Sequence, residues 1–231
     1  MLLLDVQVEI DPAKEELLNE WYYAHVPRLL SVPGYESGRR YLSLTPGPRY
    51  LALYEIKDQS YLPSLLGHDQ SLRDAKTLSE WARWDSDLVP HMSHCKTNVY
   101  RPRQEFSVPL ISSDAAIVAI RMDKTQGSRE HSERIIAAAL DEFIAVEEEA
   151  LSCRLLEAAH DPAIDWLGTS PELLLLVECA GPRAARYLAH GEGAAKALLE
   201  SLSTAGTAPQ PTAYRMIARH WPLTKGSIDA G

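Results

Sequence analysis

The sequence has little cysteine, no excess of basic residues and no long apolar run. Its three cysteines, Cys95, Cys153 and Cys179, are odd in number and widely spaced, which favours free thiols in a reducing compartment over a disulfide framework. The formal net charge of −9 provides no basic face, so we expect neither nucleic acid nor an anionic membrane as a partner. No stretch is long enough to span a bilayer, and residues 1–10 lack the basic region of a signal peptide. These absences predict a cytoplasmic protein.

Several catalytic motifs are absent as well. The sequence contains no P-loop, no GxGxxG after a strand and no G-x-S-x-G elbow, which removes support for nucleotide, nicotinamide and serine-hydrolase functions. His91 and His94 are three residues apart, but neither a helical H-E-x-x-H pattern nor a nearby carboxylate–histidine cluster accompanies them. We therefore expect no metal site.

Hydrophobic periodicity predicts the order of elements in the first half of the chain. Residues 2–10 alternate between apolar and polar, which is typical of a strand. Apolar residues then recur at helical spacing over 13–25, and Pro27 predicts the end of that helix. The expected elements that follow are strands at 36–44 and 48–56, a helical region at 60–91 and a strand at 95–103.

The second half repeats this order with little residue identity. The pattern predicts strands at 115–123, 151–159, 172–180 and 212–220, and helices at 132–146 and 182–202. We predict an α+β protein of two tandem ferredoxin-like β-α-β-β-α-β units. They span residues 1–105 and 115–220, with a linker at 106–114 and a C-terminal tail at 221–231.

Each unit should leave one face of its sheet bare, and a bare, partly apolar face must be buried. We expect the two sheets to face each other within one chain and to enclose a barrel-like chamber, which would be the natural pocket. This internal pairing replaces the dimerisation of single-unit proteins, and it leaves a further homodimer open.

The first half also resembles a known family. The residues "NEWYYAHVPRLLSVPG" at 19–34, "GRRY" at 38–41, "RYLALYEI" at 49–56, "EWARW" at 80–84 and "NVY" at 98–100 resemble the dimeric α/β barrel superfamily, and within it the EthD-like families. The resemblance implies the barrel fold. It leaves the reaction open, because the superfamily includes cofactor-free cyclases, isomerases, dehalogenases and lyases as well as haem-using monooxygenases and chlorite-dismutase-like proteins.

His25 is the first candidate catalytic residue. It shares the core-facing stripe of its helix with Leu18 and Trp21, near the end where carbonyl dipoles favour imidazolium while burial opposes it. Such a balance suits a general acid or base at the border of a cavity. The alternative is a histidine that only caps carbonyls or bonds to a strand.

Arginine and tyrosine residues supply the other candidates for the chamber. One of Arg39 and Arg40 must point inward, where it could hold a carboxylate, enolate or phenolate oxygen, unless it pairs with an acidic neighbour. We take His25, Arg40 and Tyr41 as catalytic candidates. The candidates for substrate binding are Asp5, Gln7, Tyr22, Arg39, Tyr54 and Trp81.

These residues favour a cofactor-free enzyme that acts on a small aromatic or polyketide-like molecule by proton transfer, as a lyase, isomerase or cyclase. One alternative is a haem-binding monooxygenase or peroxidase-like protein, because Trp81 and His91 are spaced as in haem-degrading members of the superfamily. The asparagine expected on the first strand is missing, since Asp5 and Gln7 hold the polar positions. A non-catalytic small-molecule binding protein is the third hypothesis.

Overall fold

The computed structural model describes residues 1–66, 71, 75–106, 116–123, 129–148, 150–167 and 171–220. In both halves the elements follow the predicted order. The first half consists of β1 (Leu2–Ile10), α1 (Glu15–Leu29), β2 (Tyr35–Ser43), β3 (Tyr50–Ile56), α2 (Leu62–Leu66), α3 (Ala75–Arg83) and β4 (Met92–Phe106). The second half consists of β5 (Ala116–Met122), α4 (Arg129–Val146), β6 (Ala150–Ala158), β7 (Leu173–Cys179), α5 (Pro182–Ala189), α6 (Ala194–Thr204) and β8 (Gln210–His220).

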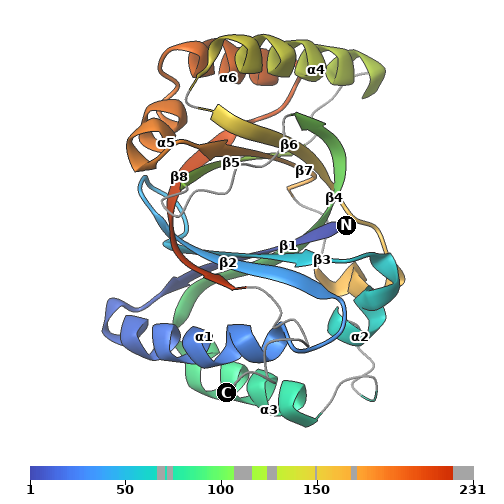
Figure 1. Cartoon of the computed structure of the whole chain (residues 1–231), viewed down its shortest axis with the longest axis vertical. Coiled ribbons are helices and arrows are strands. Elements are labelled where there is room, and N and C mark those ends of the chain that lie inside the picture. The colour runs from blue at the N-terminus through green and yellow to red at the C-terminus, as the bar shows by residue number, and fades with distance from the viewer. Residues whose placement is uncertain are drawn as a thin grey trace, which may run out of the picture.

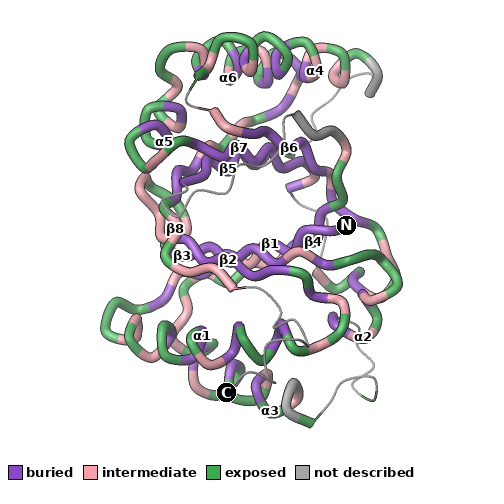
Figure 2. Tube along the Cα trace, viewed as in Figure 1, coloured by how far each residue is buried: buried purple, intermediate pink, exposed green. Residues whose placement is uncertain are grey.

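The strands form one closed antiparallel barrel in the order β1-β3-β2-β8-β5-β7-β6-β4. Two strand pairings join the halves, β2 with β8 and β4 with β6. The edge strands of one half therefore pair with the edge strands of the other. The two sheets face each other, with α1, α2 and α3 outside one and α4, α5 and α6 outside the other (Figure 1). Most of the strand residues are buried, apart from stretches of β4 and β8, while the outer helix surfaces are exposed (Figure 2). The α+β fold and the sheet-to-sheet packing are confirmed.

The barrel interior is a packed core and not the open chamber that the bare sheet faces suggest. Apolar and tyrosine side chains fill it, among them Leu53, Tyr100, Leu176 and Tyr214, because they alternate with the residues that face the helices. The chamber predicted between the sheets is therefore wrong for this central region.

A charged network inside the barrel repeats between the halves. Arg39 on β2 donates to Glu55 on β3 (2.7 Å) and to Glu178 on β7 (3.1 Å), and Arg154 on β6 donates to Glu55 (3.3 Å). Arg154 and Glu178 occupy the strands of the second half that correspond to those of Arg39 and Glu55. The halves therefore share residue identity where they pack together, a repeat that the sequence comparison of the two halves did not find.

Two helix boundaries differ from prediction. α1 continues through Pro27 to Leu29. Because proline has no N–H, the carbonyl of Tyr23 loses its helical hydrogen bond. Tyr23 is 81 % exposed, so water can bind that carbonyl instead. The helix predicted at 182–202 is two helices, because Gly191 (φ 68°) and Gly193 (φ 55°) adopt left-handed conformations between them.

The predicted boundary between the units lies partly inside a strand, because β4 continues to Phe106. The rest of the predicted linker, from residue 107, and the tail 221–231 lie outside the described residues. No helix in the described part of the chain has the length and apolar character needed to cross a membrane.

Candidate active site

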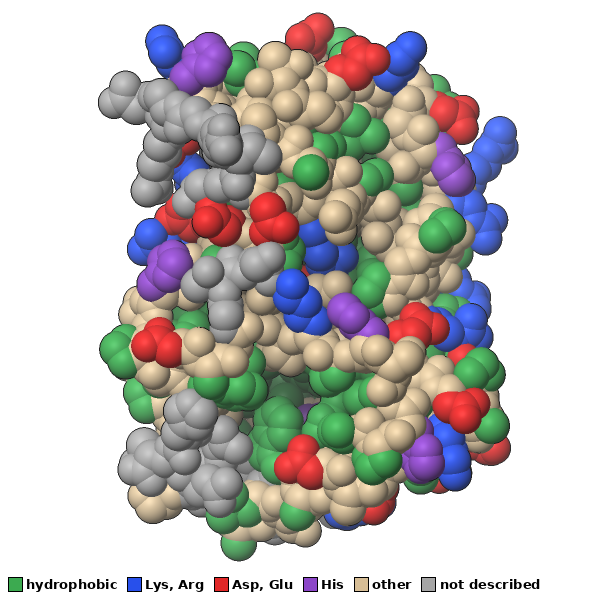
Figure 3. Space-filling model, turned by 180° about the vertical axis from the view of Figure 1, so that it is seen from behind, with side chains coloured by type: hydrophobic (Ala, Val, Ile, Leu, Met, Phe, Trp, Pro, Cys, Tyr) green, Lys and Arg blue, Asp and Glu red, His purple; other side chains and the backbone are tan. Residues whose placement is uncertain are grey.

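A cavity of about 490 Å³ lies between the helices and the sheet of the first half; we call it the aromatic pocket. Helix α1 supplies one wall and strands β1, β3 and β4 supply the floor. Figure 3 shows hydrophobic side chains around a hollow in the lower half of the molecule, where the first unit lies. The lining residues are Leu4, Val6, Trp21, Tyr22, His25, Leu29, Tyr35, Tyr54, Leu66, Trp81, Trp84, Asp85, Cys95, Lys96, Thr97, Trp166 and Leu167.

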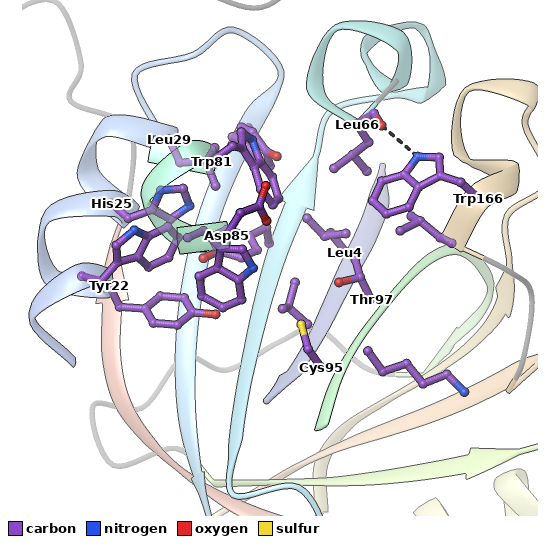
Figure 4. A pocket seen from close by; sticks show the side chains of 17 residues that line it. Leu4, Tyr22, His25, Leu29, Leu66, Trp81, Asp85, Cys95, Thr97 and Trp166 are labelled. Carbon is purple, nitrogen blue, oxygen red and sulfur yellow. Dashed lines mark hydrogen bonds between the residues drawn. The ribbon is translucent and has the colours of Figure 1, made fainter. Parts of the chain in front are cut away.

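The rings of Trp21, Tyr22 and His25 on α1 pack in a single cluster on one side of the pocket. The His25 ring is stacked on Trp21 with centroids 3.9 Å apart, and Trp84 lies 4.7 Å from Trp21. Spacings of three and four residues place Trp21, Tyr22 and His25 on the buried side of α1. Figure 4 shows His25 and Tyr22 on the side of the pocket opposite Trp166.

A π-helical turn, Trp84–Leu88, brings Trp84 and Asp85 to the pocket directly after α3. Such turns are rare and occur frequently at functional sites, because the extra residue per turn changes the direction of side chains. The sequence pattern predicted a helical region here but not this local widening.

His25 is buried and uncharged. Burial, with a contribution from Arg28, lowers the pKa of His25 from 6.5 to about 3. Its Nδ1 lies 3.8 Å from Oε2 of Glu80, which is too far for a hydrogen bond, and Arg28 pairs with the other oxygen of that carboxylate. Since Nδ1 is directed to Glu80, Nε2 is the ring nitrogen left for a ligand.

Tyr22 combines a buried phenol with a cation beside its ring. Burial raises the pKa of Tyr22, so its hydroxyl stays protonated and can donate a hydrogen bond. The Arg40 guanidinium lies 4.0 Å from the ring centroid, and its charge acts in the opposite direction, towards a more acidic phenol. Arg40 also donates to Asn19 (3.1 Å) and has no carboxylate partner among the described residues.

The second half of the chain contributes the far end of the pocket. Trp166 and Leu167 come from a 3₁₀ turn, Pro162–Leu167, between β6 and β7. The Trp166 indole donates to the carbonyl oxygen of Leu66 on α2 at 3.1 Å (Figure 4). The pocket is therefore complete only when both halves are present.

The nine sequence candidates fall into three places. His25, Tyr22, Tyr54 and Trp81 line the aromatic pocket, and Arg40 lies behind Tyr22. Asp5, Gln7, Arg39 and Tyr41 point into the barrel instead, which answers the question left open between the two arginines: Arg39 faces the interior and Arg40 the helices.

The barrel candidates are engaged with each other and with the second half. Asp5 accepts from Arg121 Nη2 at 2.9 Å, and burial raises the pKa of Asp5 despite that guanidinium. Sequence reasoning missed Asp85, Lys96 and Trp166. The one sequence feature that could have indicated Trp166 is that a tryptophan stands alone in the short connection between β6 and β7.

The residues of the pocket do not fit haem in the way that the spacing of Trp81 and His91 suggested. His91 is not among the residues that line the pocket, and its backbone carbonyl accepts from Asp11 at 2.9 Å. Among the described residues His25 is the only histidine that lines the pocket, and its ring lies flat on Trp21. The described residues also contain no group of three or more His, Cys, Asp or Glu side chains placed to hold a metal ion.

No family model and no curated protein matches the sequence. Solved structures do match it. An anthrone oxidase-like protein is 9 % identical, with 97 % of this chain and 94 % of that chain covered, at a TM-score of 0.63. A candidate monooxygenase from Fusobacterium nucleatum subsp. nucleatum is 10 % identical (95 % and 94 % covered, TM-score 0.63). A haem-binding protein from Thermus thermophilus is 9 % identical (94 % and 91 % covered, TM-score 0.52). The chain has the dimeric α/β barrel fold.

Proposed function

We propose that the aromatic pocket binds a small planar aromatic molecule and catalyses a proton transfer on it without a cofactor, as a lyase, isomerase or cyclase does. The observation that carries the proposal is the joint placement of neutral His25 and the Arg40-backed phenol of Tyr22 in a pocket walled by tryptophan. The EthD-like resemblance of residues 19–34 belongs to the same proposal, because that stretch supplies both residues.

The roles follow from the chemistry of each group. Tryptophan and tyrosine faces bind a flat ring system by stacking. Tyr22 donates a hydrogen bond to a ketone oxygen of the ligand. His25 Nε2 accepts a proton from the carbon conjugated to that ketone, the C–H electron pair moves into the ring system, and the negative charge collects on the oxygen that Tyr22 holds.

The neighbours of these two groups favour that charge movement. Arg40 stabilises negative charge that develops at the Tyr22 hydroxyl. Glu80 faces Nδ1 of His25, and the 3.8 Å separation can close to a hydrogen bond once the ring carries the extra proton. The imidazolium and the enolate are then each matched by a buried charge of opposite sign.

Anthrone is a suitable probe of this reaction. The name of one structural neighbour, an anthrone oxidase-like protein, suggests this tricyclic ketone. Loss of a C10 proton from anthrone gives a fully aromatic enolate, which makes this C–H far more acidic than an ordinary C–H. Under anaerobic conditions in D₂O, proton transfer appears as deuterium at C10 without any oxidation.

We expect the protein to accelerate this exchange, and we expect Tyr22→Phe and His25→Ala each to reduce it at least about tenfold. Tyr23→Phe is the matched control, because Tyr23 is the adjacent tyrosine and is exposed. Melting curves on the same preparations separate loss of chemistry from loss of folding. Saturable binding of anthrone without exchange would mean a non-catalytic binding protein, and absence of binding would reject the proposal.

A haem-dependent monooxygenase is distinguished on the same material. Addition of haemin to a haem protein gives a sharp Soret band that saturates at one equivalent and is lost on substitution of the ligating histidine. We expect no such His25-dependent band, because His25 is stacked on Trp21 and its Nδ1 faces Glu80.

A further inference from the structure

A second cavity, of about 610 Å³, opens at one mouth of the barrel and shares Lys96 with the aromatic pocket. We call it the mouth pocket. Its lining is more polar than that of the aromatic pocket. Its lining residues are Gln7, Glu9, Pro46, Gly47, Pro48, His94, Lys96, Arg121, Asp123, Pro171, Ala208, Gln210, Pro211 and Thr212.

Strand β4 separates the two cavities, and its pairing explains why Lys96 belongs to both. Residues 92–98 pair with β1, whereas pairing of β4 with β6 begins only at Tyr100. Along this stretch Cys95 and Thr97 line the aromatic pocket, and His94 lines the mouth pocket. Among the described residues Lys96 therefore has a strand partner on its β1 side only, and it lies at the junction of the two cavities.

The ammonium of Lys96 has no direct counter-ion within the described residues. It makes no ion pair or hydrogen bond there, although the residue is half-buried. Burial raises the pKa of Asp5 and the Lys96 charge opposes that rise, but the Asp5 carboxylate is already bound by Nε and Nη2 of Arg121, the other cation of the mouth pocket. A partly desolvated ammonium without a direct counter-ion is unfavourable, and an anionic ligand group at the junction would relieve that cost.

We infer that the ligand of the aromatic pocket is a planar aromatic carboxylate whose carboxylate group binds Lys96 at the junction of the two cavities. The inference rests on the proposed function, because it names the class of molecule that the site takes. A single negative charge fits better than a phosphate dianion, since Glu9 and Asp123 also line the mouth pocket and would repel additional charge.

The test compares anthracene-2-carboxylate with neutral 2-(hydroxymethyl)anthracene, with binding followed by quenching of tryptophan fluorescence. We expect the carboxylate to bind about tenfold more tightly, which is the range of one partly desolvated charge pair. Lys96→Met should abolish this preference without changing the affinity for the neutral compound, and Lys96→Arg should retain most of it. Lys196→Met, on the exposed surface of α6, removes the same charge elsewhere and should behave as the wild type.

High salt provides a measurement that needs no variant, because screening should reduce the preference for the carboxylate in the wild-type protein. Equal affinities for the two compounds, or a preference that survives in Lys96→Met, would overturn the inference while the deuterium exchange on anthrone still supports the proposed function. Tighter binding of anthracene-2-phosphate than of the carboxylate would overturn the assignment to carboxylates. Failure of anthracene-2-carboxylate to bind while anthrone is still turned over would also overturn it, and failure of anthrone as well would reject the proposed function.

Discussion

The guanidinium carbon of Arg40 lies 4.0 Å from the centroid of the Tyr22 ring, between strand β2 and helix α1. Arg40 does not line the aromatic pocket, but Tyr22 does. Through this contact the buried charge of Arg40 acts on the phenol of Tyr22. Asn19 fixes the guanidinium by accepting from its Nη2. In the proposed reaction, Arg40 is the residue that stabilises negative charge on Tyr22 without contacting the ligand.

Removal of this cation should slow the chemistry more than it weakens binding. Arg40→Met should lower the anthrone exchange rate at saturation about tenfold, since a desolvated cation–π contact contributes roughly 1–2 kcal/mol, with little change in the affinity for anthrone. Arg49→Met is the control, because Arg49 is exposed and lies 5.8 Å from the Tyr50 ring. An unchanged rate constant in folded Arg40→Met protein would contradict this role.

His25 should make the folded state sensitive to mild acid. Its pKa is about 3 in the folded protein and 6.5 in the unfolded chain, so below pH 6.5 the unfolded state binds a proton that the folded state does not. Stability is therefore lost as the pH falls, by about 2 kcal/mol between neutrality and about pH 5. Denaturant unfolding of wild type and His25→Gln across this range should show the additional loss only in the wild type. Parallel curves would mean that His25 titrates normally.

The element order could be predicted because it is encoded locally. The alternation of Leu2–Ile10 and the helical spacing around Trp21 each report on one element and its buried face. The break at Gly191 and Gly193 was missed because apolar residues continue at helical spacing on both sides of it. The prediction that the helix ends at Pro27 was wrong, because a proline near a helix end removes one hydrogen bond without stopping the helix.

The candidate site could be predicted only in part. His25 and Tyr22 lie in one continuous stretch, so local spacing was enough to find them. The remaining candidates depend on contacts across the barrel, such as that of Asp5 with Arg121, which are 116 residues apart. No local pattern indicates that Arg121 of the second half pairs with Asp5 on β1. Nor does any local pattern indicate that Trp166 of the second half lines a pocket of the first half.

The pair that crosses the barrel should contribute strongly to stability. Arg121→Met leaves the fully buried Asp5 carboxylate without its cation, and we expect a loss of about 3–5 kcal/mol in the free energy of unfolding. Arg101→Met breaks an ion pair with Glu157 on a side chain that is 55 % exposed, so its loss should stay below about 1 kcal/mol. Urea unfolding of both variants checks this, and similar losses would contradict the structural role of the buried pair.

Trp166 should determine affinity for flat ligands more than it determines stability. Trp166→Ala removes one end of the aromatic pocket and the hydrogen bond to Leu66, and we expect about tenfold weaker binding of anthrone. Because the side chain is half exposed, the melting temperature should change little. Trp166→Phe keeps an aromatic ring at this end of the pocket but loses the hydrogen bond. Its affinity for anthrone should lie between those of the wild type and Trp166→Ala. Unaltered binding of anthrone by Trp166→Ala would mean that Trp166, and with it the second half of the chain, does not contribute to ligand binding.

A crystal structure of the wild-type protein soaked with anthrone under anaerobic conditions tests the central claim most directly. We expect electron density for the three rings in the aromatic pocket. The ketone oxygen should lie about 3 Å from the Tyr22 hydroxyl, with C10 facing Nε2 of His25. Density inside the barrel beside Arg39 and Tyr41, or a ketone directed away from Tyr22, would contradict it.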